Sequence, residues 1–374
     1  MKIGIVCYPT YGGSGVVASE LGIAMAERGH EVHVFSYQMP FRLQFKSTKI
    51  TFHKVAISDY PLFKYPPYTE SLANELAEKI VEFDLDIIHN HYAIPHGTSA
   101  FLAKNMLRDH KVKIITTLHG TDITLVGKEK SFFRITKFII ESTDGLTSVS
   151  EWLKNETYAN FNIKKEIEVI PNFIDQEEYK EVSLKNFPDC KKIPVLCHIS
   201  NLRPVKRPLD VIRAFHLTLQ KIDCKLMLVG EGPGLDEVVA LAKELKILEK
   251  ITFKGNHADI LEVLPCADIM LLPSDKESFG LVALEAMGCG IPVVGYRAGG
   301  LPEVVKHGVT GYLAEFGDVQ GMANHIISLL NNPDQLKSFR LKSKEIAFRD
   351  FEMNKVVGQY EEFYKRVIKS SVWA

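Results

Sequence analysis

Long hydrophobic runs, paired cysteines and an excess of charge are all missing from this sequence. No stretch reaches the roughly 18 apolar residues that a membrane-spanning helix requires. The N-terminal segment MKIGIVCYPTYGG is too short and too polar for a signal peptide, so we expect a cytoplasmic protein. Because the net charge is only -1, there is no general attraction to nucleic acid or to an anionic membrane, and any recognition of anions must be local.

The cysteines are scattered along the chain without any C-x-x-C spacing, and several lie in apolar runs. We therefore expect reduced structural thiols, with a reactive or metal-binding role as the minor alternative. The cysteines are Cys7, Cys190, Cys197, Cys224, Cys266 and Cys289.

Short apolar runs alternate with stretches of helical spacing in the first half of the chain. Such alternation predicts a parallel sheet with helices on both faces. Helices are expected at 16–28, 70–83, 97–108 and 131–141. Strands are expected at 2–8, 31–36, 50–55, 86–91, 113–118, 145–148 and 167–170.

The alternation stops at 171–194, which is polar, charged and bounded by prolines, as interdomain linkers are. A second α/β series follows, and the tail from residue 318 has helical spacing. Strands of this series are expected at 193–198, 225–229, 251–254, 268–272, 292–295 and 311–314.

The length of 374 residues also fits two domains. We predict two doubly wound, Rossmann-like α/β domains, 1–170 and 193–350, joined by a linker at 171–192 and facing each other across a cleft. The C-terminal helix near 351–374 is expected to pack back on the first domain.

A glycine-rich loop follows the first strand. Gly13-x-Gly15-x-x-Ala18 formally matches a dinucleotide fingerprint, but the second strand does not end in the acidic residue that holds a nicotinamide ribose. Glycines at a helix start allow backbone N–H groups to approach an anion. The loop predicts an anion site, with a plain tight turn and a nicotinamide site as alternatives.

Two further polar loops follow strands, at 89–92 and 116–122. Open α/β sheets bind ligands at the carboxyl ends of their strands, so both loops are candidates for a site. Their histidines suggest a metal only weakly, because no carboxylate or cysteine stands at helical ligand spacing with them. The Asp84-Leu85-Asp86 sequence precedes its strand, and we interpret it as the connection between a helix and the strand that follows.

In the second half, three cations lie within five residues, at Arg203, Lys206 and Arg207, beside a predicted helix start. Such a cluster neutralises a diphosphate, whereas the alternative is a solvated basic turn.

The strongest pattern is a pair of glutamates, Glu277 and Glu285, separated by seven residues. Glu285 stands within an apolar helix, where a carboxylate is costly to bury unless hydrogen-bond donors such as ribose hydroxyls meet it. The N–H groups of residues 278–281 open this helix and can bind a phosphate. A helix-cap glutamate followed by an exposed one is the alternative.

These motifs together resemble those of family-4 retaining glycosyltransferases over nearly the whole chain. The resemblance is carried by the Glu277-SFGLVAL-Glu285 run, the PTYGGSG loop and the Asn201–Lys206 stretch. It implies a GT-B fold and a UDP-sugar donor, with no metal or other cofactor. Donor-binding residues would be Gly13, Ser14, Gly15, Asn201, Arg203, Lys206, Glu277, Ser278, Phe279, Gly280, Leu281 and Glu285.

Within that site, the resemblance implies specific roles. Glu285 would hold the uridine ribose, Glu277 the sugar hydroxyls and Lys206 the departing diphosphate, with His119 near the reacting carbon. Where many members carry an arginine five positions before the lysine, this chain has Asn201, and the compensating cation would be Arg203.

A narrower resemblance lies in CYPTYGGSGVVASELG, HNHYAIPHG and TLHGTDITLVG, which are similar to family members that transfer GlcNAc from UDP-GlcNAc to the hydroxyl of L-malate. That reaction is the first step of bacillithiol biosynthesis. The acceptor would contact Tyr92, Thr117 and Thr121, and Arg134 is the first candidate for the malate carboxylates. Reserve cations are Lys46, Arg42 and Lys128.

Several alternatives share these motifs. A family-4 enzyme with a polysaccharide or lipid acceptor has the same donor site, although the first half shows no apolar and basic helix of the kind expected for a membrane acceptor. A UDP-GlcNAc epimerase, a nicotinamide dehydrogenase and a non-catalytic sensor are the others. The sequence leaves a homo-oligomer open and predicts no nucleic-acid partner and no membrane insertion.

Overall fold

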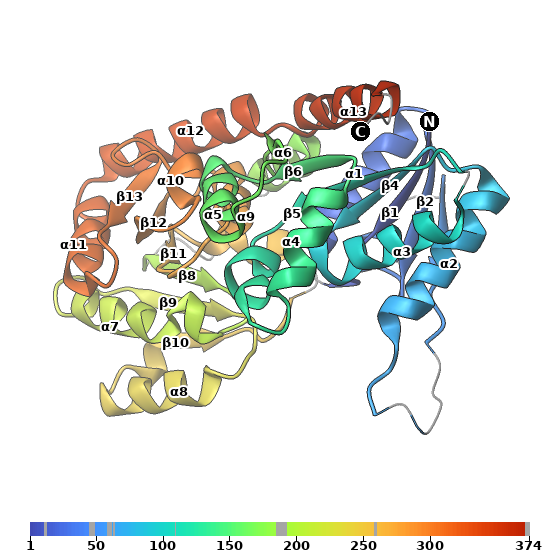
Figure 1. Ribbon diagram of the computed structural model, residues 1–374. Helices are drawn as coiled ribbons and strands as arrows, with labels where there is room; N and C mark the ends of the chain where they lie inside the picture. The colour runs from blue at the N-terminus through green and yellow to red at the C-terminus, as the bar shows by residue number, and fades with distance from the viewer. Residues whose placement is uncertain are drawn as a thin grey trace. The chain divides into compact units, whose positions relative to one another are not determined.

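The structure is a computed structural model that describes residues 1–10, 13–44, 49–57, 62, 64–108, 110–184, 193–257 and 260–370. The chain forms two compact units. Unit 1 consists of Met1–Asn172 together with Asn354–Ala374, and unit 2 consists of Phe173–Met353. Each unit is an α/β domain built on one sheet of parallel strands (Figure 1), which confirms the predicted fold class for each half.

The sheet of unit 1 has seven strands in the order β3-β2-β1-β4-β5-β6-β7. Each of the strands predicted for the first half is present, shorter by up to two residues at its ends. The strands are β1 (Lys2–Val6), β2 (Glu31–Ser36), β3 (Ile50–Lys54), β4 (Ile87–His91), β5 (Lys113–Leu118), β6 (Gly145–Ser148) and β7 (Glu168–Val169).

Helices cover both faces of this sheet because successive strand residues point to opposite sides. Gly4 of β1 packs against Phe35 and Ile88 on one face, in the core that α2 and α3 complete, whereas Ile5 packs against Gly22 of α1 on the other. The helices are α1 (Ser14–Glu27), α2 (Tyr68–Phe83), α3 (Thr98–Met106), α4 (Phe133–Ser142) and α5 (Glu151–Phe161), with short turns η1 (Phe41–Gln44), η2 (Ala93–Gly97), η3 (Thr121–Leu125) and η4 (Val126–Lys128).

The Asp84–Asp86 segment marks the end of α2 and the approach to β4, as predicted. Asp84 takes the left-handed conformation that ends the helix, and a carboxylate oxygen of Asp86 accepts a hydrogen bond from the Lys2 N–H at 2.8 Å. It lies at the amino end of the sheet and therefore away from the strand ends that carry the polar loops.

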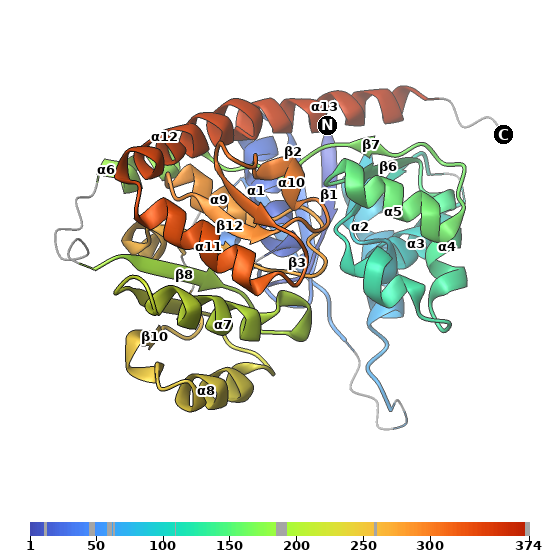
Figure 2. The same cartoon turned by 90° about the vertical axis from the view of Figure 1, so that its left-hand side faces the viewer.

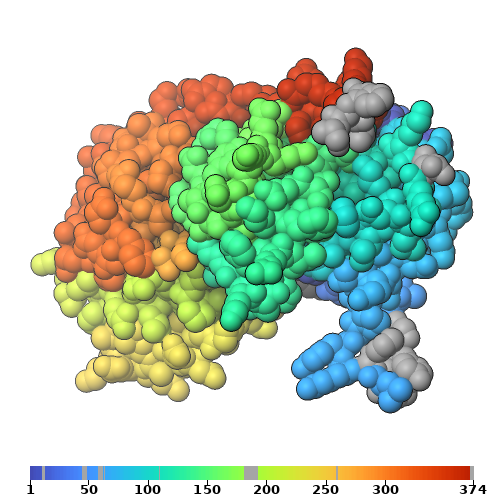
Figure 3. Space-filling view, viewed as in Figure 1, coloured from blue at the N-terminus to red at the C-terminus, as the bar shows by residue number. Residues whose placement is uncertain are grey.

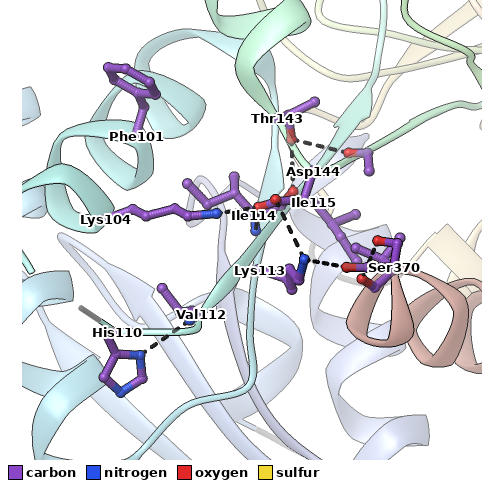
Figure 4. Close-up of polar contacts among 12 residues, drawn as sticks. Phe101, Lys104, His110, Val112, Lys113, Ile114, Ile115, Thr143, Asp144 and Ser370 are labelled. Carbon is purple, nitrogen blue, oxygen red and sulfur yellow. Dashed lines mark hydrogen bonds and ion pairs between the residues drawn. The ribbon is translucent and has the colours of Figure 1, made fainter. Parts of the chain in front are cut away.

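The last helix, α13 (Met353–Lys369), belongs to unit 1 although the whole of unit 2 precedes it in the chain. Phe363 and Val367 of this helix pack against Gly145 at the start of β6. The Nζ of Lys113 donates to the Ser370 carbonyl at 2.8 Å (Figure 4). A cation at a helix C-terminus is favourable because the unpaired carbonyls there carry partial negative charge.

Asp144 joins three elements at the same edge of the sheet. Its carboxylate accepts from the Ile114 N–H of β5 and from the Nζ of Lys104 of α3, both at 2.7 Å (Figure 4). The Asp144 N–H in turn donates to the Ile114 carbonyl at 2.8 Å. These contacts fix the amino end of β5, opposite the end that carries His119.

Unit 2 has a six-stranded parallel sheet in the order β10-β9-β8-β11-β12-β13. All of its predicted strands are present. They are β8 (Val195–Ile199), β9 (Lys225–Val229), β10 (Ile251–Phe253), β11 (Ile269–Leu272), β12 (Val293–Tyr296) and β13 (Gly311–Ala314).

One face of this sheet packs against α7, α8 and α11 around a core that includes Leu226, Phe215 and Ile326; Figure 2 shows α7 and α8 beside β8 and β10. On the other side of the unit α12 packs along α9. The helices are α7 (Pro208–Leu219), α8 (Leu235–Glu244), α9 (Leu281–Gly288), α10 (Leu301–Val304), α11 (Val319–Leu330) and α12 (Pro333–Asp350), with turns η6 (Pro204–Lys206), η7 (Leu248–Lys250), η8 (Ile260–Glu262) and η9 (Leu264–Cys266).

The segment interpreted as a linker contains a helix, α6 (Gln176–Leu184). Its Tyr179 is buried and packs against Gly288 of α9, so this part of the segment is integrated into unit 2. The sequence pattern does not predict this helix, because most of its residues are polar or charged and show no apolar periodicity. Cys190 lies outside the described residues, and no disulfide forms among the cysteines that the structure describes, of which Cys7, Cys197 and Cys224 are buried.

Candidate active site

Both sheets reverse their strand order at one point, and the predicted loops follow the strands at those two points. In unit 1 the reversal lies between β1 and β4, and in unit 2 between β8 and β11. Parallel sheets bind ligands outside the carboxyl ends of the strands at such positions, because adjacent loops there diverge to opposite faces. The topology thus gives each unit its own candidate ligand-binding edge.

The glycine loop of unit 1 leads into α1 at Gly13. Gly13 has φ 63°, a conformation that disfavours side chains, and no side chain in the described ranges caps the α1 N-terminus. A Cβ on Gly15 would lie 2.5 Å from the Tyr8 carbonyl oxygen, so only glycine allows this close packing. Ser14 is mostly buried. The geometry leaves the first N–H groups of α1 available for an anion.

The histidines after β4 and β5 form a cluster, which we call the histidine cluster: His89, His91, His96 and His119. His91 Nδ1 lies 2.9 Å from His119 Nε2, and the His89 and His91 rings are 4.4 Å apart. His96 Nδ1 donates to the His91 carbonyl at 2.8 Å. Burial lowers the pKa of His89 and His119 to about 3 and that of His96 to about 4, so these rings are neutral near pH 7.

Asp122 joins the loops that follow β4 and β5. One carboxylate oxygen accepts from the Ala93 N–H at 3.0 Å, and the other accepts from the Gly120 N–H at 3.0 Å and the His119 N–H at 3.3 Å. Burial raises the pKa of Asp122 to about 6, although these N–H groups favour the carboxylate. Asp122 therefore fixes the backbone that carries His119.

The acceptor candidates differ in accessibility. Tyr92 is half-buried, with its ring 5.3 Å from that of His119, and Thr121 is also half-buried. Thr117 is fully buried, and its hydroxyl bonds to His89 Nε2 at 2.7 Å and to the Thr147 hydroxyl at 2.6 Å. Thr117 thus supports the histidine cluster from within the sheet and does not face an acceptor, which corrects the sequence-based assignment.

Among the candidate cations for the malate carboxylates, Arg134 is exposed at the start of α4 and forms no ion pair within the described part of the chain. Arg42 pairs with Glu20 at 3.5 Å and Lys128 with Glu156 at 3.6 Å. Lys46 lies outside the described residues. Arg134 remains the first candidate because its charge is not already neutralised.

In unit 2 the loops after β8 and β11 are joined by an ion pair. Lys206 Nζ lies 2.7 Å from Oε2 of Glu277, and both side chains are mostly buried. The Asp275 N–H donates to the Val205 carbonyl at 2.9 Å, which adds a backbone contact between the same loops. The two residues predicted for the diphosphate and the sugar are thus brought together.

The other cations of the β8 loop separate into two kinds. Arg203 is exposed and has no ion pair with a residue that the structure describes, and the neutral Asn201 on the same loop is exposed as well. Arg207 instead pairs with the buried Asp210 at 2.6 Å and lies 5.1 Å over the Phe316 ring. Arg207 therefore stabilises the start of α7, and Arg203 is the cation left for a ligand.

Glu285 lies within α9, and its side chain is mostly buried, as the spacing predicts. Gly280, before the first residue of α9, has φ 97°, and none of the described side chains caps this helix. The loop at Glu277 is supported by Gly299 and Gly300. The Gly300 N–H donates to the Glu277 carbonyl at 2.7 Å, and a Cβ on Gly299 would lie 2.1 Å from that oxygen. Ser278, Phe279 and Leu281 complete this turn.

Sequence reasoning assigned no individual role to His91, Asp122 or Gly299. Asp122 could have been found from its position in the TLHGTD loop after a predicted strand. Gly299 could have been found from the glycine pair that shortly follows β12. His91 gave no signal of its own, since its role depends on a contact with a residue 28 positions away.

Exposed apolar side chains gather at α4 in unit 1. Phe132, Ile135 and Phe138 around and within α4 are 41 %, 37 % and 47 % exposed, and Arg134 lies among them. The exposed apolar side chains and Arg134 therefore lie together within α4 or directly before it, in a part of the chain that is green in the colouring by residue number of Figure 3. No helix in the described ranges is long and apolar enough to cross a membrane.

Two parallel α/β domains, with glycine loops, a paired lysine and glutamate and a buried glutamate at their switch points, define a glycosyltransferase of the GT-B type. The sequence comparisons agree. Residues 11–178 match the model of Glycosyltransferase Family 4, and residues 178–346 match that of glycosyl transferases group 1. The chain belongs to glycosyltransferase family 4, which leaves the nicotinamide interpretation of the glycine loop without support.

Among its relatives, the chain is 44 % identical over 373 residues to the N-acetyl-alpha-D-glucosaminyl L-malate synthase of Bacillus anthracis, covering 99 % of this chain and 98 % of that protein. An uncharacterized glycosyltransferase of Methanocaldococcus jannaschii is 27 % identical and covers 97 % of both chains.

Solved structures share the fold. A glycosyltransferase from Rickettsia africae has a TM-score of 0.82 at 21 % identity and covers 99 % of both chains. HepE from Anabaena, in complex with UDP and glucose, has a TM-score of 0.82 at 22 % identity and covers 98 % of this chain and 99 % of that one.

Proposed function

We propose that this protein transfers GlcNAc from UDP-GlcNAc to the hydroxyl of L-malate with retention at the anomeric carbon. The observation that supports glycosyl transfer is the Lys206–Glu277 pair at the switch point of unit 2. The support for the two substrates is the 44 % identity, over almost the whole chain, with the synthase from Bacillus anthracis. The product would be GlcNAc-malate, consistent with the place in bacillithiol biosynthesis that the sequence resemblance implies.

The donor would be held by residues of unit 2. Glu285 accepts hydrogen bonds from the ribose hydroxyls, since a mostly buried carboxylate is stabilised by such donors. Glu277 accepts from hydroxyls of the sugar, while Lys206 and the α9 N-terminus neutralise the diphosphate. Arg203 supplies a second cation at the diphosphate, because the side chain of Asn201 is neutral.

The reaction would proceed by attack on the face from which UDP departs. The malate hydroxyl oxygen bonds to the anomeric carbon as the bond to the phosphate oxygen breaks, and a phosphate oxygen takes the hydroxyl proton. Lys206 stabilises the charge that develops on UDP. No step requires a metal ion or another cofactor, and in this proposal malate contacts Tyr92, Thr121 and Arg134 of unit 1.

The test incubates the purified protein with UDP-GlcNAc, with and without L-malate, in the absence of added metal. We expect UDP release that depends on malate, and a product with the mass of GlcNAc-malate and an α linkage. UDP-GlcNAc binding without malate-dependent turnover would refute the acceptor. Conversion of UDP-GlcNAc to an isomer without any acceptor would identify an epimerase.

A lipid acceptor is the second candidate, because Phe132, Ile135 and Phe138 expose an apolar face beside Arg134. The same assay with vesicles of anionic lipid in place of malate distinguishes the two. Turnover that requires vesicles would favour the lipid, whereas we expect turnover with malate alone, in accord with a cytoplasmic enzyme.

A further inference from the structure

His91 and His119 share a hydrogen bond that restricts where each ring carries its proton. His91 Nδ1 lies 2.9 Å from His119 Nε2, and the rings are stacked with centroids 5.1 Å apart. Both rings are neutral near pH 7, because burial holds the pKa of each below its usual range. A neutral imidazole has one N–H, so one ring must donate to the other.

The two remaining nitrogens differ in their surroundings. His91 Nε2 is buried and has no hydrogen-bond partner among the residues described. His119 Nδ1 also makes no hydrogen bond to this part of the chain, but His119 is only half-buried and lies next to Tyr92. His119 Nδ1 is therefore the nitrogen left for a substrate.

If His119 donated from Nε2, the proton of His91 would stand on Nε2, an N–H group buried without an acceptor. Such groups are rarer in proteins than acceptors that lack a donor. If His91 donates from Nδ1, its buried Nε2 is a bare acceptor. The neighbouring His96 has this second arrangement, with Nδ1–H bonded to the His91 carbonyl and Nε2 bare among the described residues.

We propose that His91 donates its Nδ1–H to His119 Nε2 and thereby fixes the His119 proton on Nδ1. His119 then presents a hydrogen-bond donor to its ligand, suited to a sugar hydroxyl or a phosphate oxygen, and is not a base. His91 is a positioning residue, held in turn by the ring of His89, whose Nδ1 bonds to the Tyr364 hydroxyl at 2.7 Å. The consequence for substrate binding rests on the proposed function, whereas the tautomer itself does not.

The direct test is ¹H–¹⁵N correlation spectroscopy of the full chain labelled with ¹⁵N in its histidine rings, with signals assigned by His91→Asn and His119→Gln. We expect His119 as the Nδ1–H tautomer and His91 with a bare Nε2. Detection of His119 with its proton on Nε2 in the wild-type protein would overturn the proposal, whether or not any activity is found.

Variants of His91 extend the test. An asparagine amide at this position can still donate to His119 Nε2, so His91→Asn should keep the tautomer and most of the turnover. His91→Phe should release it and lower kcat about tenfold or more, with a smaller change in KM. An unchanged His119 spectrum in His91→Phe would contradict the proposal; should this variant not fold, the wild-type and His91→Asn spectra still decide.

His53→Phe provides the matched control. His53 is a buried histidine of the same unit whose Nε2 lies 2.8 Å from His33 Nδ1, and its described ring contacts are with residues outside the histidine cluster. It should leave the His119 spectrum and kcat at neutral pH unchanged. The expected spectra together with no turnover on UDP-GlcNAc and malate would uphold the tautomer and reject the proposed function.

Discussion

Lys206 Nζ lies 2.7 Å from Glu277 Oε2, and this ion pair joins two loops whose residues are 71 positions apart in the chain. The pair brings a cation and an anion together at the switch point of unit 2. A nucleotide sugar carries a complementary set of groups, a negative diphosphate and hydroxyls that donate hydrogen bonds. The donor can therefore replace the ion pair with one contact to each residue.

Lys206→Ala should lower kcat about 10²- to 10³-fold, because a preorganised charge that meets the departing phosphate is lost. Steady-state rates with UDP-GlcNAc and malate measure the effect. Lys250→Ala is the matched control, since Lys250 pairs with Asp223 at 2.8 Å in the same unit but far along the chain from the loops of the site. Equal rates in wild type and Lys206→Ala would show that the lysine does not act on the leaving group.

Glu285→Gln should weaken UDP binding about 10- to 100-fold, because hydrogen bonds to a charged acceptor contribute roughly 1.5–3 kcal/mol. Titration calorimetry with UDP alone measures this without turnover. Glu237→Gln replaces an exposed glutamate in the first turn of α8 and should leave UDP affinity unchanged. Tight UDP binding by Glu285→Gln would remove Glu285 from the ribose site.

Arg203→Ala should lower kcat about tenfold, whereas Asn201→Ala should have a smaller effect, if the exposed arginine supplies the second cation at the diphosphate. Both side chains are exposed on the same loop, so the pair is matched for burial. The rate of malate-dependent UDP release compares them. A larger loss in Asn201→Ala would reverse the assignment.

Asp122→Ala should destabilise the fold by about 3 kcal/mol and also raise KM, because the N–H groups of Ala93 and Gly120 lose their acceptor. Urea denaturation and steady-state kinetics measure the two effects. Asp144→Ala is the control: Asp144 also accepts a backbone N–H, from Ile114, but at the opposite end of β5. It should lower stability without changing KM, and a similar KM for both variants would deny Asp122 a role in the site.

Acid should destabilise the protein below pH 6.5 through its buried histidines. Burial lowers the pKa of His198 to about 4, so between pH 6.5 and 4 the unfolded chain binds a proton that the folded chain does not. Stability from this group is present above pH 6.5 and is lost as the pH falls. The loss for His198 alone is about 2 kcal/mol between pH 7 and pH 5.

His198→Asn should show a smaller loss of unfolding free energy between pH 7 and pH 5 than the wild-type protein, measured by urea denaturation at both values. The raised pKa of Asp122, about 6, acts in the opposite direction: its contribution is present below pH 4 and is lost as the pH rises through 6. An identical pH dependence in His198→Asn and wild type would show that folding does not lower the pKa of His198.

The sequence by itself determined the strands, the parallel class of both sheets and the loops of the site. Alternating apolar runs and helical spacing are local patterns, and the carboxyl ends of parallel strands necessarily meet at one edge. The glycine loop, the Lys206 loop and the Glu277 loop could therefore be assigned to the candidate site from their positions directly after strands β1, β8 and β11.

Only the tertiary structure decided which side chains contact each other at that edge. Thr117 and Tyr92 both lie at strand ends, yet Thr117 points into the interior and Tyr92 toward His119. The His91–His119 bond, the hydrogen bond from the Ala93 N–H to Asp122 and the return of α13 to unit 1 all join parts of the chain that are separated in sequence. Such contacts depend on strand order and register, which local sequence patterns do not encode.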